Sequence, residues 1–471
     1  MKLVVVGGGY VGLVSAVCFA KSHVETLVLE KNEARLALLK KGQSPIYEPG
    51  LSEALREEIL AGHLSFSASY KAAMKGAEAV FIAVGTPALE EDSASQQKND
   101  LDLSQIDAAL NSIAENCASS ELLVVVKSTV PTGTCQKTQE FLQKKRPEVA
   151  FTVLCNPEFL REGTALKDFM NPDRILIGLP VLAPKEKTQI KAFFKQLYRE
   201  IDPAQQKTLF VSLESAELAK SASNVFLAMK ASFINEMADV CEATGADILE
   251  VAQAMGQDVR IGPHFLKPGP GIGGACFPKD SRALVATAQA NDLRTDLLQA
   301  VMSSNKWRQQ RLAERISERL GGVLKGKWIG VLGVAFKAGT DDVRDAPALS
   351  ILPYLLQAGA LLQIYDPQAM ENAKKTFEKM QILKGKESLL RWMKAPEDVA
   401  EQADLILLLT EWGDFEKLSP SLLAQKMRGK KILDYRNCLE RAAFEQAGLD
   451  VEGLGRGNAA REDEKHAQDR R

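Results

Sequence analysis

Short apolar runs that end at glycines or small polar residues recur through the first part of the chain. Residues 3–6 are wholly apolar, residues 10–22 carry apolar side chains at helical spacing, and residues 26–30 (TLVLE) form a second strand-like run. Strands of a parallel sheet are buried on both faces, so this order predicts a strand, a helix and a parallel strand. The segments AVFIAVGTP, LLVVVKSTVPTGT and FTVLCNPEF repeat the strand and its turn. Ligands bind beyond the carboxyl ends of such strands, so we expect these turns to line one crevice.

The periodicity changes near residue 212. From about Ser212 to Cys241, apolar residues recur at helical intervals and predict one long helix. Residues 326–336 and 361–367 then repeat the strand, glycine turn, helix and strand of the N-terminus. The pattern predicts an α/β protein with two Rossmann-like doubly wound domains joined by a long central helix. We expect domains at 1–205, 206–315 and 316–455, a polar surface loop at 89–100 and a disordered, charged tail at 456–471.

Composition narrows the function classes. The chain has 471 residues, of which 45% are hydrophobic and 25% charged, as in soluble proteins of several domains. A formal net charge of -2 offers no global basic surface, so no nucleic-acid partner is expected. The first residues lack the pattern of a signal peptide, and no apolar run is long enough to cross a bilayer. These features predict a cytoplasmic protein without a membrane partner.

Cysteine and histidine usage argues against metal binding. The seven cysteines form no CxxC pair, which favours reduced thiols over a disulfide framework. The four histidines do not cluster with cysteine or acidic residues at metal-ligand spacing. We therefore expect no metal.

A dinucleotide fingerprint stands at the first predicted strand. Gly7, Gly9 and Gly12 supply G-x-G-x-x-G between strand and helix, and Glu30 ends the next strand at the separation expected for an acid that holds ribose hydroxyls. An acid there would repel a 2'-phosphate, which favours NAD over NADP, although the nearby Arg35 complicates that preference. A second glycine turn, around residues 330–333, lacks the full spacing; it fits a nucleotide-shaped ligand and plain strand-helix packing about equally.

The segment GPGIGGACFPKD points to a cysteine nucleophile. Three glycines before Cys276 can bring backbone N–H groups close to phosphate oxygens, and Pro278 favours a helix start beside the thiol. A metal ligand or a redox switch is the alternative, but no partner cysteine lies close in sequence. Asp280 follows four residues later, on the same face of that helix or simply as a charge at its first turn.

Two further pairs are candidates for the same crevice. Lys220 and Asn224 lie four apart in the predicted long helix, flanked by small residues, and form either a ligand site or a solvated face. Glu158 and Glu162 follow a predicted strand end, although the pair by itself is uninformative.

Seven motifs together resemble the UDP-glucose/GDP-mannose dehydrogenase family, from residue 1 to about residue 455. They are GGGYVG, VGTP, KSTVPTGT, NPEFLREGTALKDFMNPDRILIG, ELAKSASNVFLAMKASFINE, RIGPHFLKPGPGIGGACFPKD and GVAFKAGTDDVRDAPAL. The resemblance implies a four-electron oxidation at sugar C6 with two NAD+, through a cysteine thiohemiacetal and a thioester. RIGPHFL followed by GGACFPKD favours UDP-glucose as substrate and UDP-glucuronate as product. The alternatives are UDP-N-acetylmannosamine and GDP-mannose.

The resemblance also assigns residues to roles. It implies Cys276 as nucleophile, Lys220 with Asn224 as oxyanion donors, Thr129 with Asp280 around a water, and Asp280 and Glu158 as acid/base groups. It implies an NAD site at Gly7, Gly9, Tyr10, Val11, Gly12, Glu30, Arg35, Thr86, Thr129, Glu162, Lys279 and Arg344. It implies a substrate site at Glu158, Phe159, Leu160, Lys220, Asn224, Arg260, Phe265, Leu266, Lys267, Gly271, Gly273, Gly274, Phe277, Lys337 and Arg436.

The resemblance further implies a homo-oligomer, at least a dimer, made through the central helix, with Arg260 reaching a neighbouring subunit. The three expected domains would then bind NAD, form the dimer with the substrate loop, and bind the UDP-sugar. The sequence departs from the family pattern at Ala275 and at Pro268 and Pro270. It also departs at position 435, which is tyrosine here and generally glycine in the family. Two more distant readings stay open: a two-electron dehydrogenase of the 6-phosphogluconate type, which needs no cysteine, and a non-catalytic nucleotide sensor.

Overall fold

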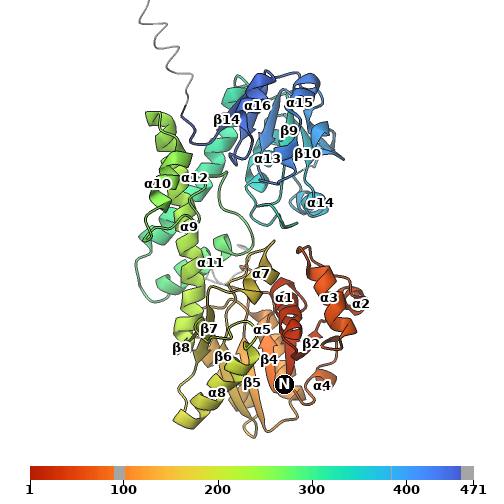
Figure 1. Ribbon diagram of the computed structural model, residues 1–471, viewed down its shortest axis with the longest axis vertical. Helices are drawn as coiled ribbons and strands as arrows, with labels where there is room; N and C mark the ends of the chain where they lie inside the picture. Colours follow the sequence, from red (N-terminus) through yellow and green to blue (C-terminus); the bar gives the residue numbers. More distant parts are fainter. Residues whose placement is uncertain (90–100, 383, 458–471) are drawn as a thin grey trace, which may run out of the picture. The chain divides into compact units, whose positions relative to one another are not determined.

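The computed structural model describes residues 1–89, 101–382 and 384–457. The chain divides into two compact units, one of residues 1–223 and 282–294, the other of residues 224–281 and those from 295 onwards (Figure 1). The predicted loop, apart from residue 89, and the predicted tail from residue 458 lie outside the described residues.

The first unit is built on an eight-stranded sheet in the order β3-β2-β1-β4-β5-β6-β7-β8. All neighbouring strands pair in parallel except β6 and β7, which meet antiparallel. The first six strands have the Rossmann order. The strands are β1 (Lys2–Val6), β2 (Glu25–Leu29), β3 (Leu64–Ser67), β4 (Ala79–Ile82), β5 (Glu121–Val126), β6 (Ala150–Cys155), β7 (Ile175–Leu179) and β8 (Thr208–Ser212).

Helices cover both faces of this sheet. Along β1, Leu3 and Val5 pack into one hydrophobic core and Val4 and Val6 into another, because successive strand side chains point to opposite faces. The helices are α1 (Tyr10–Lys21), α2 (Glu33–Lys40), α3 (Leu51–Leu60), α4 (Tyr70–Ala73), α5 (Ser104–Asn116), α6 (Thr134–Lys145), α7 (Ala165–Met170) and α8 (Pro184–Leu197). Burial on both faces explains why these strands lack apolar-polar alternation.

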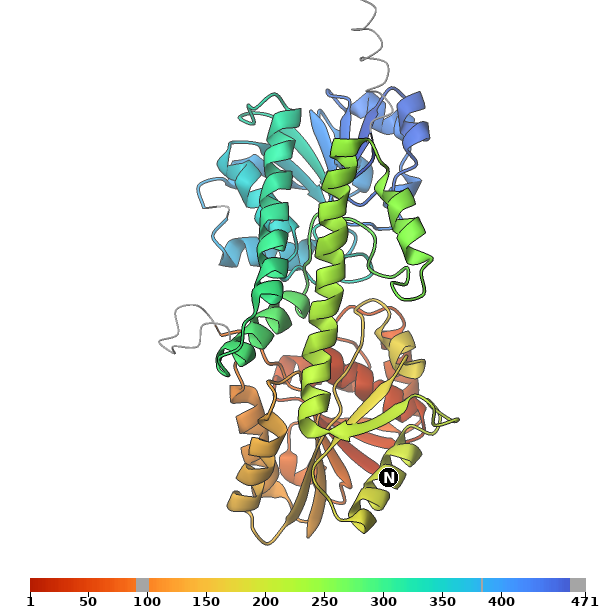
Figure 2. The ribbon, with the colours of Figure 1, turned by 90° about the vertical axis from the view of Figure 1, so that its left-hand side faces the viewer.

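Two helices pass from one unit to the other. Helix α9 (Leu213–Thr244) is one continuous helix of 32 residues that begins in the first unit and ends in the second (Figure 2). Helix α11 (Phe277–Gln289) runs from the second unit back into the first.

The second unit holds a six-stranded parallel sheet in the order β11-β10-β9-β12-β13-β14, which is the Rossmann order again. Its strands are β9 (Trp328–Leu332), β10 (Leu361–Tyr365), β11 (Leu390–Trp392), β12 (Leu405–Leu408), β13 (Lys431–Asp434) and β14 (Asp450–Gly453). Its helices are α10 (Ile248–Gly256), α12 (Asp296–Arg319), α13 (Ala348–Gln357), α14 (Met370–Lys379), α15 (Pro420–Lys426) and α16 (Arg441–Gln446). Three 3-10 turns complete it: η1 (Glu387–Leu389), η2 (Pro396–Ala400) and η3 (Phe415–Lys417).

The second glycine turn is filled by the protein itself. A Cβ at Gly330 would lie 2.3 Å from the Val399 carbonyl oxygen, and one at Gly333 would lie 2.4 Å from the Thr410 Cβ. Close packing alone therefore accounts for both glycines.

The predicted fold class is confirmed: two doubly wound domains, one with a mostly parallel and one with a parallel sheet, and a long central helix. Within the described residues, no helix is both long and apolar enough to span a bilayer.

Candidate functional site

The turn after β1 leaves open space at one glycine only. Gly7 has a φ of +107°, and a Cβ at Gly12 would lie 1.9 Å from the Gly7 carbonyl oxygen, so both positions require glycine for the turn and its packing. A Cβ at Gly9 would meet no atom within 4 Å. The backbone at Gly9 is thus accessible from the carboxyl end of β1, where a pyrophosphate approaches the start of a helix in dinucleotide-binding domains.

Glu30 lies beside that turn, at the carboxyl end of β2. It is buried, and its carboxylate accepts a hydrogen bond from the Asn32 N–H at 2.7 Å. A Cβ at Gly8 would lie 2.8 Å from Glu30 Oε2, which places the acid directly over the glycine turn. Arg35 is exposed on α2. The first unit therefore fits NAD at its predicted pyrophosphate and ribose positions.

The turns after β4 and β5 are joined by a hydrogen bond. The buried Thr86 hydroxyl donates to the Thr129 carbonyl oxygen at 2.8 Å. Thr129 is half-buried, and the hydroxyl of Ser128 donates to the Val84 carbonyl oxygen at 2.7 Å. These two strand ends therefore form one wall beside the turn of β1, as the strand pattern predicts.

Glu158 and Lys220 form a buried ion pair in the first unit. Lys220 Nζ lies 2.8 Å from Glu158 Oε1, and the Leu160 N–H donates to Glu158 Oε2 at 2.5 Å. Burial opposes the ionisation of Glu158, but the charge and hydrogen bond of Lys220, the Leu160 amide and the charge of Lys127 outweigh it and hold the pKa of Glu158 below its usual value. Glu158 is therefore a carboxylate at neutral pH.

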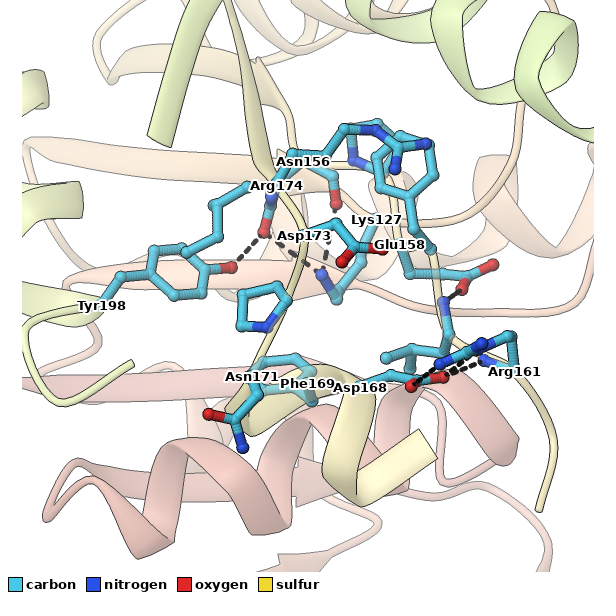
Figure 3. Close-up of a pocket in the computed structure, with 15 residues that line it drawn as sticks. Lys127, Asn156, Glu158, Arg161, Asp168, Phe169, Asn171, Asp173, Arg174 and Tyr198 are labelled. Carbon is cyan, nitrogen blue, oxygen red and sulfur yellow. Dashed lines mark hydrogen bonds and ion pairs between the residues drawn. The ribbon is translucent and has the colours of Figure 1, made fainter. Parts of the chain in front are cut away.

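A pocket of about 80 Å³ lies beneath the Glu158 segment (Figure 3). On one side, the buried Lys127 donates to Asn156 Oδ1 at 3.2 Å, and the Tyr198 hydroxyl donates to the same atom at 2.6 Å. On the other, the Arg174 guanidinium stacks on the Phe159 ring, 3.7 Å from its centroid. Glu158 and Phe159, two of the predicted substrate residues, thus line this pocket.

In the second unit, Asp280 is bound by two of the predicted site residues. Asn224 Nδ2 donates to Asp280 Oδ2 at 2.6 Å, and Lys279 Nζ lies 2.7 Å from Asp280 Oδ1. The Asp280 N–H donates to the Cys276 carbonyl oxygen at 2.8 Å, so Cys276 stands immediately before the first turn of α11. Cys276 is exposed, whereas the other cysteines are buried or half-buried. The structure therefore brings Cys276, Asn224, Lys279 and Asp280 together.

Glycines of the predicted substrate loop serve mainly to fit it against the second unit. A Cβ at Gly273 would lie 2.6 Å from the Asp345 carbonyl oxygen, and one at Gly274 would lie 2.9 Å from the Phe336 ring. Gly271 and Gly274 have φ values of +131° and +87°. The Gly274 N–H donates to the Arg344 carbonyl oxygen at 2.8 Å. In this structure the Gly274 N–H is therefore already paired within the fold.

The predicted arginines have different environments. The half-buried Arg436 donates to the Leu409 and Phe336 carbonyl oxygens, each at 2.7 Å. Arg344 is exposed and forms a two-pronged ion pair with Asp342. The Arg260 side chain is 85% exposed.

The remaining predicted substrate residues Phe265, Leu266, Lys267 and Lys337 also lie in the second unit. Phe265 has a φ of +63° and contacts Phe277, ring centroids 5.9 Å apart. Leu266 is buried, Lys267 is exposed, and Lys337 Nζ lies 5.5 Å from the Phe336 ring centroid. Tyr435, the departure from the family pattern, is fully buried, and its hydroxyl donates to the Leu312 carbonyl oxygen at 3.1 Å. The Tyr435 ring therefore packs in the hydrophobic core, and Arg436 still donates to the Leu409 and Phe336 carbonyl oxygens.

Sequence reasoning missed three buried charges near these residues. Glu48 accepts hydrogen bonds from Tyr10 and from the segment after Glu162. Glu217 accepts from the Gly133 and Cys135 amides at the start of α6, and the charge of Lys127 acts on Glu158. Only Lys127 had a sequence signal, since it directly follows an apolar strand and begins the motif KSTVPTGT. Among the described residues, no group of three or more histidine, cysteine or acidic side chains could hold a metal.

The glycine turn, the acid at the end of β2 and the Rossmann order define a dinucleotide-binding domain of the oxidoreductase class. Comparison with known families gives three matches, all from one family: its NAD binding domain at residues 1–202, its central domain at 214–307 and its UDP binding domain at 330–441. The chain therefore belongs to the UDP-glucose/GDP-mannose dehydrogenase family. The predicted resemblance is confirmed, and the cofactor is NAD.

Individual relatives agree over nearly the whole chain. The UDP-glucose 6-dehydrogenase of Rhizobium meliloti is 39% identical over 456 residues, covering 97% of this chain and 100% of the relative. A UDP-glucose dehydrogenase structure from Pyrobaculum islandicum superposes with a TM-score of 0.84 at 34% identity, covering 97% of this chain and 98% of the other. A UDP-D-ManNAc dehydrogenase structure from Pyrococcus horikoshii gives a TM-score of 0.81 at 26% identity, covering 97% and 100%.

Proposed function

We propose that this protein oxidises UDP-glucose at C6 to UDP-glucuronate with two NAD+, through covalent intermediates on Cys276. The observation that carries the proposal is an exposed cysteine at the start of α11, one helical turn from a carboxylate that Asn224 and Lys279 hold in place. A helix start favours the thiolate, which is the nucleophilic form. A cysteine is needed because an aldehyde must gain a nucleophile before it can give up a hydride.

When bound, NAD+ supplies the hydride acceptor for both oxidations. In the first oxidation, Asp280 and Thr129 hold a water that takes the C6 hydroxyl proton. The Cys276 thiolate then forms a C–S bond to the aldehyde carbon, and Lys220 and Asn224 stabilise the oxyanion. The two side chains suit a shared role because they lie one turn apart on α9.

Loss of the second hydride converts the thiohemiacetal into a thioester of Cys276. Water then adds to the thioester carbon, the C–S bond breaks, and the acid product leaves while the thiol is recovered. Asp280 and Glu158 act as acid/base groups in this step. The lowered pKa of Glu158, maintained against its burial by Lys220, keeps it in the ionised form that a base requires.

The substrate choice rests on relatives. The relative named UDP-glucose 6-dehydrogenase is 39% identical to this chain, and the structure named UDP-D-ManNAc dehydrogenase is 26% identical. UDP-N-acetylmannosamine and GDP-mannose remain the second candidates with the same chemistry. NADH formation with each of the three sugar nucleotides separates them, and silence with UDP-glucose would exclude our choice.

The mechanism is tested by Cys276→Ser. We expect the parent protein to form two NADH per UDP-glucose and the variant to stall at an aldehyde or covalent stage, because serine is a far weaker nucleophile. Mass spectrometry of the stopped reaction detects an adduct on the protein. Cys438→Ser is the matched control, since burial raises the pKa of the Cys438 thiol to about 12. Full conversion to the acid by Cys276→Ser would overturn the mechanism, and one NADH per substrate in the parent would favour a two-electron dehydrogenase.

We also propose a homodimer formed along α9. Phe226, Phe233 and Val240 lie seven residues apart on one side of this helix and are 57%, 45% and 49% exposed. Large apolar side chains in such a row are typical of a helix that packs against a second copy. Arg260 would then exchange its ion pair with Asp258 for the sugar nucleotide of the neighbouring subunit; its side chain is 85% exposed.

A further inference from the structure

Glu48 is a buried carboxylate on which donors from two separate segments converge. It lies between α2 and α3 and is 6% exposed. Its oxygens accept hydrogen bonds from the Tyr10 hydroxyl, from the Gly163 N–H at 2.6 Å and from the Ala165 N–H at 2.7 Å. No role in the proposed reaction has been given to it so far.

Both segments belong to the NAD site of the proposed function. Tyr10 is the first residue of α1 and directly follows the glycine turn. Gly163 directly follows Glu162, and Ala165 begins α7. Glu48 is therefore a single side chain that connects the turn under the pyrophosphate to the segment that carries Glu162.

We propose that Glu48 is a positioning residue that fixes the separation of the glycine turn and the 162–165 segment, and thereby sets the affinity for NAD. This inference rests on the proposed function, because that function assigns both segments to the cofactor.

The three donors around Glu48 suit a side chain that accepts at both of its terminal atoms. A carboxylate accepts at both oxygens, whereas a protonated acid or an amide would turn a donor toward one of the three donors already present. Burial raises the pKa of Tyr10, and the hydrogen bond and charge of Glu48 raise it further, so Tyr10 remains a donor to Glu48. The two backbone amides have no rotational freedom to adapt to a second donor.

The test variant is Glu48→Gln in the full-length chain. We expect the KM for NAD+ and the Kd for NADH, the latter measured by fluorescence titration, to rise about tenfold. The reason is that one charge-assisted hydrogen bond is lost and the new amide NH2 group faces one of the donors around residue 48. The KM for UDP-glucose should change little, because Glu158 is held by Lys220 and the Leu160 amide without help from Glu48. At saturating NAD+, kcat should be largely retained.

Asp202→Asn is the matched control. Asp202 is also a buried carboxylate that accepts backbone amides, those of Gln206, Lys207 and Thr208, at 3.0, 3.1 and 3.0 Å. It precedes β8, which β4, β5, β6 and β7 separate from β1 in the sheet. This variant should lose thermal stability as Glu48→Gln does and leave the KM for NAD+ unchanged.

A fall in Tm for Glu48→Gln with an unchanged KM for NAD+ and Kd for NADH would overturn the proposal, since Glu48 would then be only structural. If Glu48→Gln cannot be purified, Glu48→Asp keeps the charge on a shorter side chain; a raised Kd for NADH supports the proposal and an unchanged one contradicts it. NADH binding is measured without sugar, so the result for Glu48 stands even if the parent fails to oxidise UDP-glucose. That second failure would count against the proposed function alone.

Discussion

At the scale of single residues, Lys127 places an ammonium group in the interior of the first unit. Its side chain is almost fully buried and donates to the Asn156 carbonyl and side-chain oxygens. Burial lowers the pKa of Lys127 from 10.5 to about 8, although the charge of Glu158 opposes this shift. Burying the charged lysine therefore makes the free energy of folding less favourable, by an amount that depends on pH.

The sign of that dependence gives a prediction. Below about pH 8 Lys127 is charged in both states, and between about pH 8 and 10.5 only the unfolded chain keeps the proton, so the stability of the folded protein rises with pH in this window. From pH 7.5 to 9.5 the parent should gain about 2 kcal/mol relative to Lys127→Met. Calorimetry at both pH values measures the difference in Tm. The exposed Lys185→Met is the control, and a Tm difference for Lys127→Met that does not change with pH would contradict the assignment.

At the scale of elements, the turn between β1 and α1 separates a folding requirement from a binding requirement. Gly12→Ala would place a methyl group 1.9 Å from the Gly7 carbonyl oxygen, so we expect a loss of about 1–3 kcal/mol and a clear fall in Tm. Gly9→Ala meets no atom within 4 Å, and Gly9 has an ordinary φ of -79°. It should leave the Tm of the free protein almost unchanged.

NAD binding should respond in the opposite order. The methyl group of Gly9→Ala would occupy the surface that the pyrophosphate approaches, so the affinity for NADH should fall about tenfold or more. The NAD+-induced rise in Tm should shrink accordingly. An unchanged NADH affinity in Gly9→Ala would show that the cofactor does not pass over this turn.

The helices and strands could be predicted from the sequence because their signals are local. The side-chain contacts that hold them together could not be predicted. The apolar run at residues 3–6 and the helical spacing from about Ser212 to Cys241, where the structure has α9, each specify their own conformation. The pairing of Glu158 with Lys220 joins residues 62 positions apart, and that of Glu48 with Ala165 joins residues 117 apart. Such partners are set by strand order and loop path, for which a single sequence carries no periodic signal. The hydrogen bond from the Gly274 N–H to the Arg344 carbonyl oxygen, 70 positions further along the chain, was unpredictable for the same reason.

At the scale of the whole molecule, the proposed dimer depends on the exposed row on α9. Phe226, Phe233 and Val240 recur every seven residues, so they return to one side of the helix after two turns. A single exposed phenylalanine is unremarkable on a soluble protein, but three large apolar side chains on one side of the same helix are typical of a surface that packs against a partner. A two-fold dimer would bury each row against its copy, because the same surface meets itself across the axis.

Phe226→Glu combined with Phe233→Glu tests this arrangement. Four like charges would face one another in the dimer, so the variant should sediment as a single chain of 51.4 kDa while the parent sediments at twice that mass. Val181→Glu is the control, because Val181 is fully exposed outside α9. If Arg260 acts on the substrate of the neighbouring subunit, the monomeric variant should also lose UDP-glucose turnover while its NADH affinity stays unchanged, since Glu30 and the glycine turn lie within one chain. A parent that sediments as a monomer would refute the dimer, and a monomeric variant with full turnover would confine Arg260 to a structural role.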